Sequence, residues 1–203
     1  MNNKIPNLAW LLLLLGLFPM TAQAKGKQWL VYERCELADE KYFDGDSFSV
    51  KALTGYTYVF RLYGVDCPET DQRVASRLTE QAKDFGVEEK ELLSWGRKAS
   101  AFTKKFLRKP FTVYTRKTKA RGASKKARYY AIVVNADGKR LDEALIEAGL
   151  ARAYGFGADW DEPFWNQTKN DLPRKIDAKR FMAKLHAMES KAKRERVGIW
   201  GKR

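Results

Sequence analysis

Histidine and cysteine are scarce in this sequence, which holds one histidine and two cysteines among 203 residues. A zinc ion usually takes three or four ligands from these residue types. Cysteine nucleophiles need a histidine nearby. The one histidine, His186, lies in a basic, helix-like segment, and no sequence motif pairs it with Cys35 or Cys67. The sequence therefore excludes a zinc centre of the usual kind and gives no sign of a catalytic cysteine.

Acidic residues are outnumbered, with 25 aspartates and glutamates against 39 lysines and arginines and a net charge of +14. Such a surplus attracts polyanions, of which nucleic acid is the commonest. Composition alone leaves two other interpretations open. One is a basic surface that only keeps the protein soluble, and the other is attraction to anionic lipid.

Long apolar runs are absent except near the N-terminus, at Leu8–Phe18. Lys4 precedes this run and the small-x-small sequence Ala22-Gln23-Ala24 follows it, the pattern of a secretory signal peptide. An uncleaved membrane anchor is the alternative, although the run is shorter than the ~20 residues that span a bilayer. We expect residues 1–24 to be removed and residues 25–203 to form one exported domain, periplasmic or extracellular, with no membrane partner.

The most informative stretch is Phe60–Thr70, which predicts a strand that runs into a charged turn. Apolar residues dominate its first half, and Pro68 ends any ladder pairing. Arg61 lies within the strand, while Asp66 and Glu69 follow where it stops. One cation and two carboxylates around one point suit a hard metal ion and an anionic substrate.

A second acidic turn, Phe43–Phe48, contains an Asp-Gly hairpin signal. If both turns meet at one end of a small sheet, Asp44 and Asp46 converge with Asp66 and Glu69. Four carboxylates cannot all stay ionised in one place without a partner, so a bound cation is the natural resolution.

These segments resemble the staphylococcal nuclease (thermonuclease) family, and the resemblance runs from about Val31 to Trp200. Together the two acidic turns look like that family's active-site signature. Five further segments follow in the family's order: Gly96–Thr103, Ala136–Lys139, Glu143–Leu145, Gly149–Ala151 and Gly198–Trp200.

The apolar patterns predict an α+β protein, a five-stranded β-barrel of the oligonucleotide-binding (OB) type with about three helices, and the resemblance implies the same fold. We expect strands at 28–35, 48–53, 56–64, 111–116 and 129–135, and helices at 94–107, 141–148 and 177–196. The polar stretch 71–94, longer than in the family, predicts a loop with some helix around 74–85 and no chemistry.

The resemblance implies that the protein is a nuclease acting on DNA and/or RNA. In that case Asp46, Asp66 and the backbone carbonyl of Cys67 bind one Ca²⁺ ion, which suits an all-oxygen ligand set. Glu69 positions or deprotonates the attacking water. Asp44 is expected to act as an outer carboxylate that shapes the turn.

Two arginines are expected to bind the scissile phosphate, Arg61 and a second one near the start of the last strand. The family's spacing selects Arg128, with Arg121 as the alternative, because alanine replaces the expected glycine before Arg128. Lys125 and Lys126, in the cation-rich stretch 115–128, are expected to contact phosphates in a mobile loop; a plain solvated charge run is the alternative.

Three expectations concern the surroundings of the site. Tyr154 lies at nearly the family spacing for a tyrosine that contacts substrate. The aromatics of 154–180 either stack bases or cover the barrel. An oxidising compartment would permit a disulfide between Cys35 and Cys67, with two separate thiols as the alternative.

The competing function is a binding module that uses the same barrel to hold nucleic acid without cutting it. We expect the protein to be a monomer with either function. Barrels of this kind lose catalysis when acids or arginines are replaced. In this sequence Asp46, Arg61, Asp66 and Glu69 are all present, which favours the enzyme.

Overall fold

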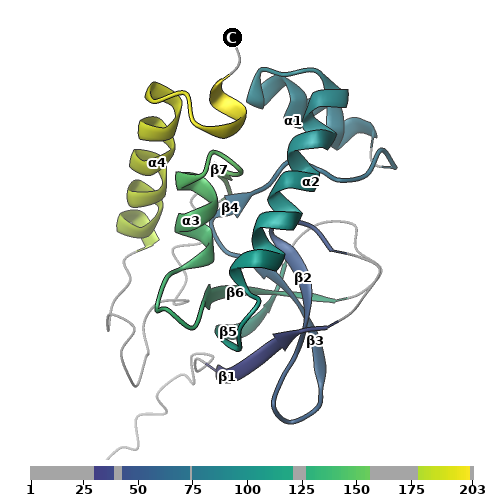
Figure 1. Ribbon diagram of the computed structural model, residues 1–203, viewed down its shortest axis with the longest axis vertical. Helices are drawn as coiled ribbons and strands as arrows, with labels where there is room; N and C mark the ends of the chain where they lie inside the picture. Colours follow the sequence, from purple (N-terminus) through teal and green to yellow (C-terminus); the bar gives the residue numbers. More distant parts are fainter. Residues whose placement is uncertain (1–29, 39–42, 74, 121–126, 156–177, 202–203) are drawn as a thin grey trace, which may run out of the picture.

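The structure, a computed structural model, describes residues 30–38, 43–73, 75–120, 127–155 and 178–201. A β-barrel forms one half, and helices lie above and beside it (Figure 1). In these ranges no helix is both long and apolar enough to cross a membrane. The predicted leader, residues 1–24, lies outside the described residues.

Five strands close into the barrel in the order β1-β2-β3-β6-β5. Neighbouring strands are antiparallel except β3 and β6, which are parallel and are joined through the helices and β5. This confirms the predicted α+β fold with an OB-type barrel. The strands are Leu30–Leu37 (β1), Ser47–Lys51 (β2), Thr57–Leu62 (β3), Phe111–Lys119 (β5) and Arg128–Val134 (β6).

Side-chain alternation along β3 separates the core from the site. Phe60 and Leu62 are fully buried in the barrel, whereas Arg61 between them is partly exposed. Successive side chains of a strand point to opposite faces, so Arg61 projects away from the interior. Ser47 of β2 is its cross-strand partner and therefore shares its face.

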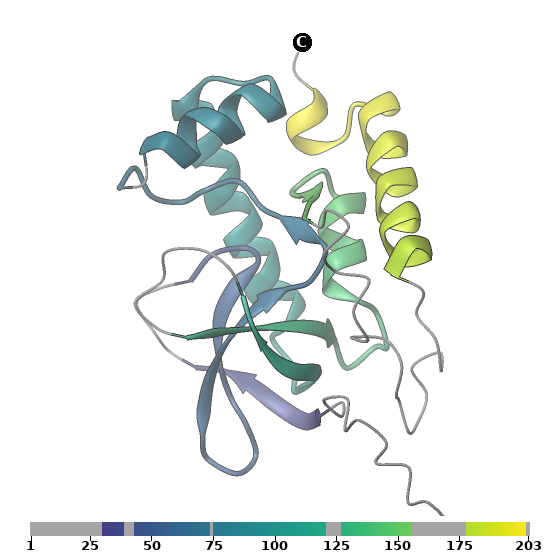
Figure 2. The same ribbon diagram turned by 180° about the vertical axis from the view of Figure 1, so that it is seen from behind.

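Within the described residues four α-helices lie above and beside the barrel: Ala75–Phe85 (α1), Glu89–Phe106 (α2), Leu141–Glu147 (α3) and Ala178–Arg194 (α4). The first corresponds to the helix expected around 74–85. Helix α1 packs on α2, and α3 lies between α2 and α4 (Figures 1 and 2). On α4 the predicted apolar stripe is confirmed, since Phe181, Leu185 and Ala192 are buried.

Helix α2 has charges that suit its ends. Glu89 and Glu91 lie in its first turn, and Lys104 and Lys105 in its last, where they interact favourably with the helix dipole. Its buried residues recur at three- and four-residue spacing, which is typical of an amphipathic helix: Leu92, Leu93, Gly96, Ala99 and Thr103.

A two-stranded sheet connects the barrel to the helices (Figure 2). It consists of Val65–Asp66 (β4) and Arg152–Ala153 (β7), paired antiparallel with Asp66 opposite Arg152. The chain therefore brings an arginine from beyond α3 directly to the strand end that carries the acidic turn.

Candidate active site

The two acidic turns meet at one end of the barrel, which fulfils the condition for the convergence of their acids. The backbone N–H of Cys67, in the second turn, donates to Oδ2 of Asp46, in the first, at 2.6 Å. The N–H of Leu62 donates to the Asp46 carbonyl at 2.7 Å. The hydroxyl of Thr70 donates to Oδ1 of Asp44, so Asp44 links the outer parts of the two turns.

Helix α2 lies directly against both turns because glycines remove the intervening side chains. A Cβ on Gly96 would lie 2.1 Å from the carbonyl oxygen of Glu69. A Cβ on Gly45 would lie 2.7 Å from Cβ of Ala99. The Thr103 hydroxyl donates to the Gly45 carbonyl at 2.7 Å. The helix thus fixes the backbone of both turns.

Arg61 bridges the two turns with its guanidinium. Nη1 lies 2.7 Å from Oδ1 of Asp46, and Nη2 lies 2.6 Å from Oδ1 of Asp66. Both carboxylates are buried. Burial raises the pKa of Asp46 to about 7, with Arg61 opposing it. One arginine therefore holds two of the acids that the sequence singles out.

Asp66 is the centre of the cluster and is completely buried. Besides Arg61, it accepts hydrogen bonds from Arg77 at Oδ1 and from Arg152 at Oδ2, the latter at 3.0 and 3.1 Å. Burial by itself would raise the pKa of Asp66, but the three arginines together hold it below its ordinary value. Asp66 is therefore ionised at neutral pH.

Glu69 lies at the outer side of the cluster, with a side chain 17% exposed. One carboxylate oxygen accepts a hydrogen bond from Nε of Arg77, and its backbone N–H donates to the Gln81 side chain at 2.8 Å. Burial raises the pKa of Glu69, and Arg77 opposes that rise. A carboxylate that is partly buried and partly accessible suits a general base.

Arg77 and Gln81 come from α1, in the stretch for which the sequence predicts no chemistry, yet both side chains contact the acidic cluster. They are four residues apart and share a helix face. The Gln81 amide is fully buried and donates to Oδ2 of Asp66 at 2.8 Å and to the Cys67 carbonyl at 3.0 Å. The sequence signal that could have identified Gln81 is its position, a glutamine among the apolar residues of one face of α1.

Arg128 lies beside Arg61. Nη1 of each guanidinium is 3.4 Å from the Ser47 hydroxyl oxygen. Burial lowers the pKa of Arg128, and the nearby charges of Arg61 and Arg77 lower it further. The structure thus gathers four guanidinium groups near the carboxylates, those of Arg61, Arg77, Arg128 and Arg152. Arg121, Lys125 and Lys126 lie outside the described residues.

Tyr154 lies near the cluster but at its edge. The residue is 40% exposed, and its ring packs against the Arg152 guanidinium, whose carbon is 4.5 Å from the ring centroid. Its backbone N–H donates to the Gly64 carbonyl at 3.0 Å. The structure therefore places Tyr154 against an arginine that binds Asp66, on an accessible surface.

Comparison with protein families matches most of this chain. A family model described as staphylococcal nuclease homologue matches residues 59–202. The chain belongs to the staphylococcal nuclease family. The match starts in β3 and so includes Arg61, Asp66, Glu69 and Arg128. Membership of this nuclease family makes nucleic acid the substrate class.

The cysteines of this nuclease homologue are not bridged, which corrects the proposed disulfide. Both are free and buried. Cys35 packs inside the barrel, where its thiol donates to the Tyr32 carbonyl at 3.3 Å, whereas the Cys67 sulfur lies against Gly45. Burial raises the pKa of the Cys35 thiol to about 11, so it stays protonated. The two turns are joined instead by Arg61 and the Asp46 hydrogen bond.

The oxygens expected to bind a metal ion accept hydrogen bonds in pairs, each pair from one side chain. Arg61 contacts both Asp46 and Asp66, and the Gln81 amide contacts both Asp66 and the Cys67 carbonyl. Within the described ranges no three His, Cys, Asp or Glu side chains are grouped to hold a metal ion, but this set needs only two side chains and a carbonyl. The all-oxygen set fits a hard cation.

Proposed function

We propose that this protein is an exported, Ca²⁺-dependent nuclease that hydrolyses phosphodiester bonds of DNA and/or RNA. The observation that carries the proposal is the convergence of Arg61 and Arg128 on the Ser47 hydroxyl, next to the carboxylates of Asp46, Asp66 and Glu69. Cations suited to a phosphate thus lie beside a carboxylate suited to activating water.

Glu69 is the proposed general base. It takes a proton from the water that attacks the phosphorus, and its raised pKa brings it closer to the basicity that this transfer needs. The hydrogen bond from its backbone N–H to Gln81 fixes the start of the side chain.

Arg61 and Arg128 are the proposed phosphate-binding groups. In the transition state of phosphodiester hydrolysis, charge accumulates on the phosphoryl oxygens. Guanidinium groups donate two parallel hydrogen bonds to such oxygens. Arg61 is oriented by Asp46 and Asp66, so its position is set before the substrate arrives.

A Ca²⁺ ion would be held by Asp46, Asp66 and the carbonyl of Cys67, with Asp44 shaping the turn from outside. When bound, it would supply positive charge that polarises the phosphate. Each of the three ligand residues also accepts a hydrogen bond from an arginine or an amide in this structure, so the ion would share these residues with hydrogen-bond donors.

Export, either to the periplasm or outside the cell, follows from the predicted signal peptide and suits a calcium-requiring enzyme. We propose that the protein acts as a monomer. Three further residues are proposed to contact the nucleic acid beyond the scissile phosphate: Tyr154, Lys125 and Lys126. Such contacts would set the base specificity of cleavage.

The test is cleavage of single-stranded DNA, double-stranded DNA and RNA by the purified protein, with Ca²⁺ and with the chelator EGTA. We expect cleavage in Ca²⁺ and its loss in EGTA. Gel-shift binding measured on the same samples separates the alternatives. Binding with no cleavage under any divalent metal would contradict the proposal and identify a non-catalytic binding module.

The second catalytic arginine gives a separate prediction. Replacing Arg128 by lysine should lower kcat/KM by about 10²–10³-fold, because a point charge replaces a two-pronged donor at the phosphate. The same change at Arg121 should have an effect of less than about threefold. Steady-state kinetics on one fluorescent oligonucleotide measure both. The reverse ranking would transfer the catalytic role to Arg121.

A further inference from the structure

One guanidinium from helix α1 bridges two of the acids of the proposed active site. Arg77 donates through Nη2 to Oδ1 of Asp66 and through Nε to Oε1 of Glu69. The first acid is a proposed metal ligand and the second is the proposed base. A single planar side chain therefore ties together the two groups that the reaction uses separately.

The oxygens of Asp66 have no lone pair to spare. Oδ1 accepts from Arg61 and Arg77, and Oδ2 accepts from Gln81 and twice from Arg152. An ionised carboxylate offers about four lone-pair positions. A cation can therefore bind Asp66 only if one of these donors leaves.

Three of the four donors are held in place by other contacts. Gln81 is buried and also bonds the Cys67 carbonyl. Arg152 is 9% exposed and also pairs with Asp84 on α1. Arg61 is 13% exposed and also pairs with Asp46.

Arg77 differs from these three donors. Its side chain is 28% exposed, the most of the four, and both of its ion pairs in the described structure are to the catalytic acids. It is also the donor that lies on the accessible side of the cluster, beside Glu69. Of the four, it can leave with the least disturbance to the fold.

We propose that Arg77 is a built-in competitor of the metal ion, which holds Asp66 and Glu69 until a divalent cation displaces it. Displacement frees an oxygen of Asp66 for the ion and, in the same movement, frees Glu69 to accept the proton of water. Cation binding and activation of the base are thereby coupled through one side chain. This inference rests on the proposed function, since it concerns that site's cation.

The test measures Ca²⁺ binding by isothermal titration calorimetry, without substrate. Arg77→Gln removes the competitor and should lower the Kd for Ca²⁺ by about tenfold or more, as expected when charge-assisted hydrogen bonds no longer oppose binding. Arg77→Lys keeps the charge but cannot span both carboxylates, so its Kd should lie between the two. Thermal melting shows that each variant is folded.

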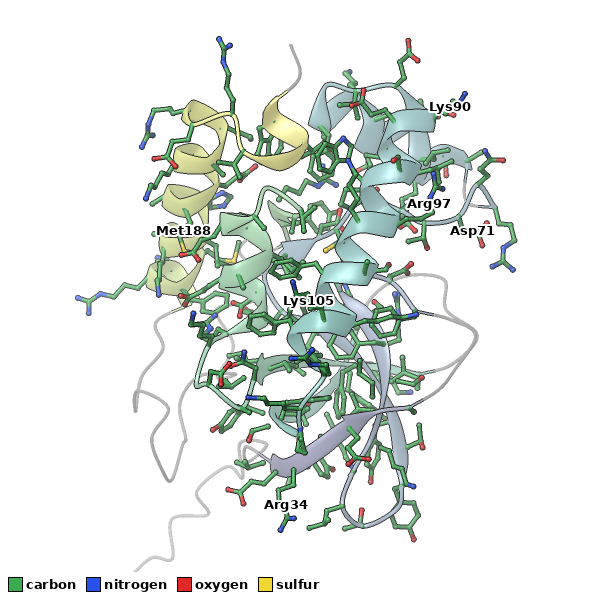
Figure 3. The ribbon with its side chains drawn as sticks, viewed as in Figure 1. Arg34, Asp71, Lys90, Arg97, Lys105 and Met188 are labelled. Carbon is green, nitrogen blue, oxygen red and sulfur yellow. The ribbon has the colours of Figure 1, made fainter. Side chains whose placement is uncertain are left out.

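Arg73→Gln is the matched control, because it removes the same charge from a neighbouring position. Arg73 is 70% exposed and pairs with Asp71, at the outer edge of the molecule, where Figure 3 labels Asp71. Its Kd should stay within about twofold of the wild type, since exposed charges are screened. Asp46→Asn should abolish the calorimetric signal, which ties the signal to this site.

Two failures are distinguishable. If the wild type cuts DNA in Ca²⁺ and Arg77→Gln binds Ca²⁺ no more tightly than Arg73→Gln, the competition is wrong and the proposed function stands. Weaker binding by Arg77→Gln would overturn it equally, because Arg77 would then support the ion. If neither protein binds Ca²⁺ and the wild type does not cut, the proposed function and the competition both fail.

Discussion

Replacing Glu69 by glutamine is expected to lower kcat for phosphodiester cleavage by about 10²–10⁴-fold, the usual contribution of a general base. Glutamine has the same size and keeps the backbone hydrogen bond to Gln81, but its amide cannot take a proton from water. Affinity for the nucleic acid should change little, because Arg61 and Arg128 remain. Single-turnover cleavage of a labelled oligonucleotide, together with gel-shift binding, measures both quantities.

The control is Glu147→Gln, an exposed position at the end of α3, which should cleave like the wild type. Residual cleavage by Glu69→Gln above about a tenth of the wild-type rate would exclude Glu69 as the base. The pH dependence of cleavage activity gives a second test, because the direction of its shift can be predicted. Glu69 works ionised, and burial raises its pKa. As the pH is lowered, activity should therefore be lost at a pH above the ordinary glutamate pKa of about 4.3.

Replacing Asp66 by asparagine should lower the free energy of unfolding by about 3–5 kcal/mol, the cost of removing one partner from a buried ion pair. Asp66 is the shared counterion of three arginines, and the variant leaves Arg61, Arg77 and Arg152 without it. Urea unfolding at pH 7, followed by tryptophan fluorescence, gives the difference. This should be among the largest effects of any isosteric substitution in the domain.

The destabilisation should depend on pH. Since folding lowers the pKa of Asp66, its stabilising contribution is complete above the unfolded value of about 3.9 and is lost as pH falls through the lower folded value. The difference between wild type and variant should therefore shrink in acid. Asp71→Asn, at an exposed pair with Arg73, should have near wild-type stability. Equal stabilities of wild type and Asp66→Asn at pH 7 would contradict the central role of Asp66.

Much of the fold could be predicted because the alternation of apolar and polar residues along a strand is visible in its local sequence. Phe60 and Leu62 alternate with Arg61, which predicts both a strand and an outward-facing arginine. The stripe of Phe181, Leu185 and Ala192 likewise predicts α4. Periodicity cannot fix the β4–β7 pairing, since two-residue strands are too short to show a pattern.

The acids of the site could be predicted and most of their partners could not. Asp46 and Asp66 stand at strand ends with turn residues around them, a local signal. Arg77, Gln81 and Arg152 reach the same point only through tertiary packing, from an inserted helix and from a strand beyond α3. Charged residues in a polar stretch look like solvated surface until their partners are known.

The most direct test of the account is a crystal structure of Glu69→Gln with Ca²⁺ and a short single-stranded DNA. The account predicts the ion on Asp46, Asp66 and the Cys67 carbonyl, one phosphate between Arg61 and Arg128, and Arg77 no longer bonded to Asp66. A phosphate bound away from both Arg61 and Arg128, or an ion bound without Asp46 and Asp66, would contradict the proposed active site.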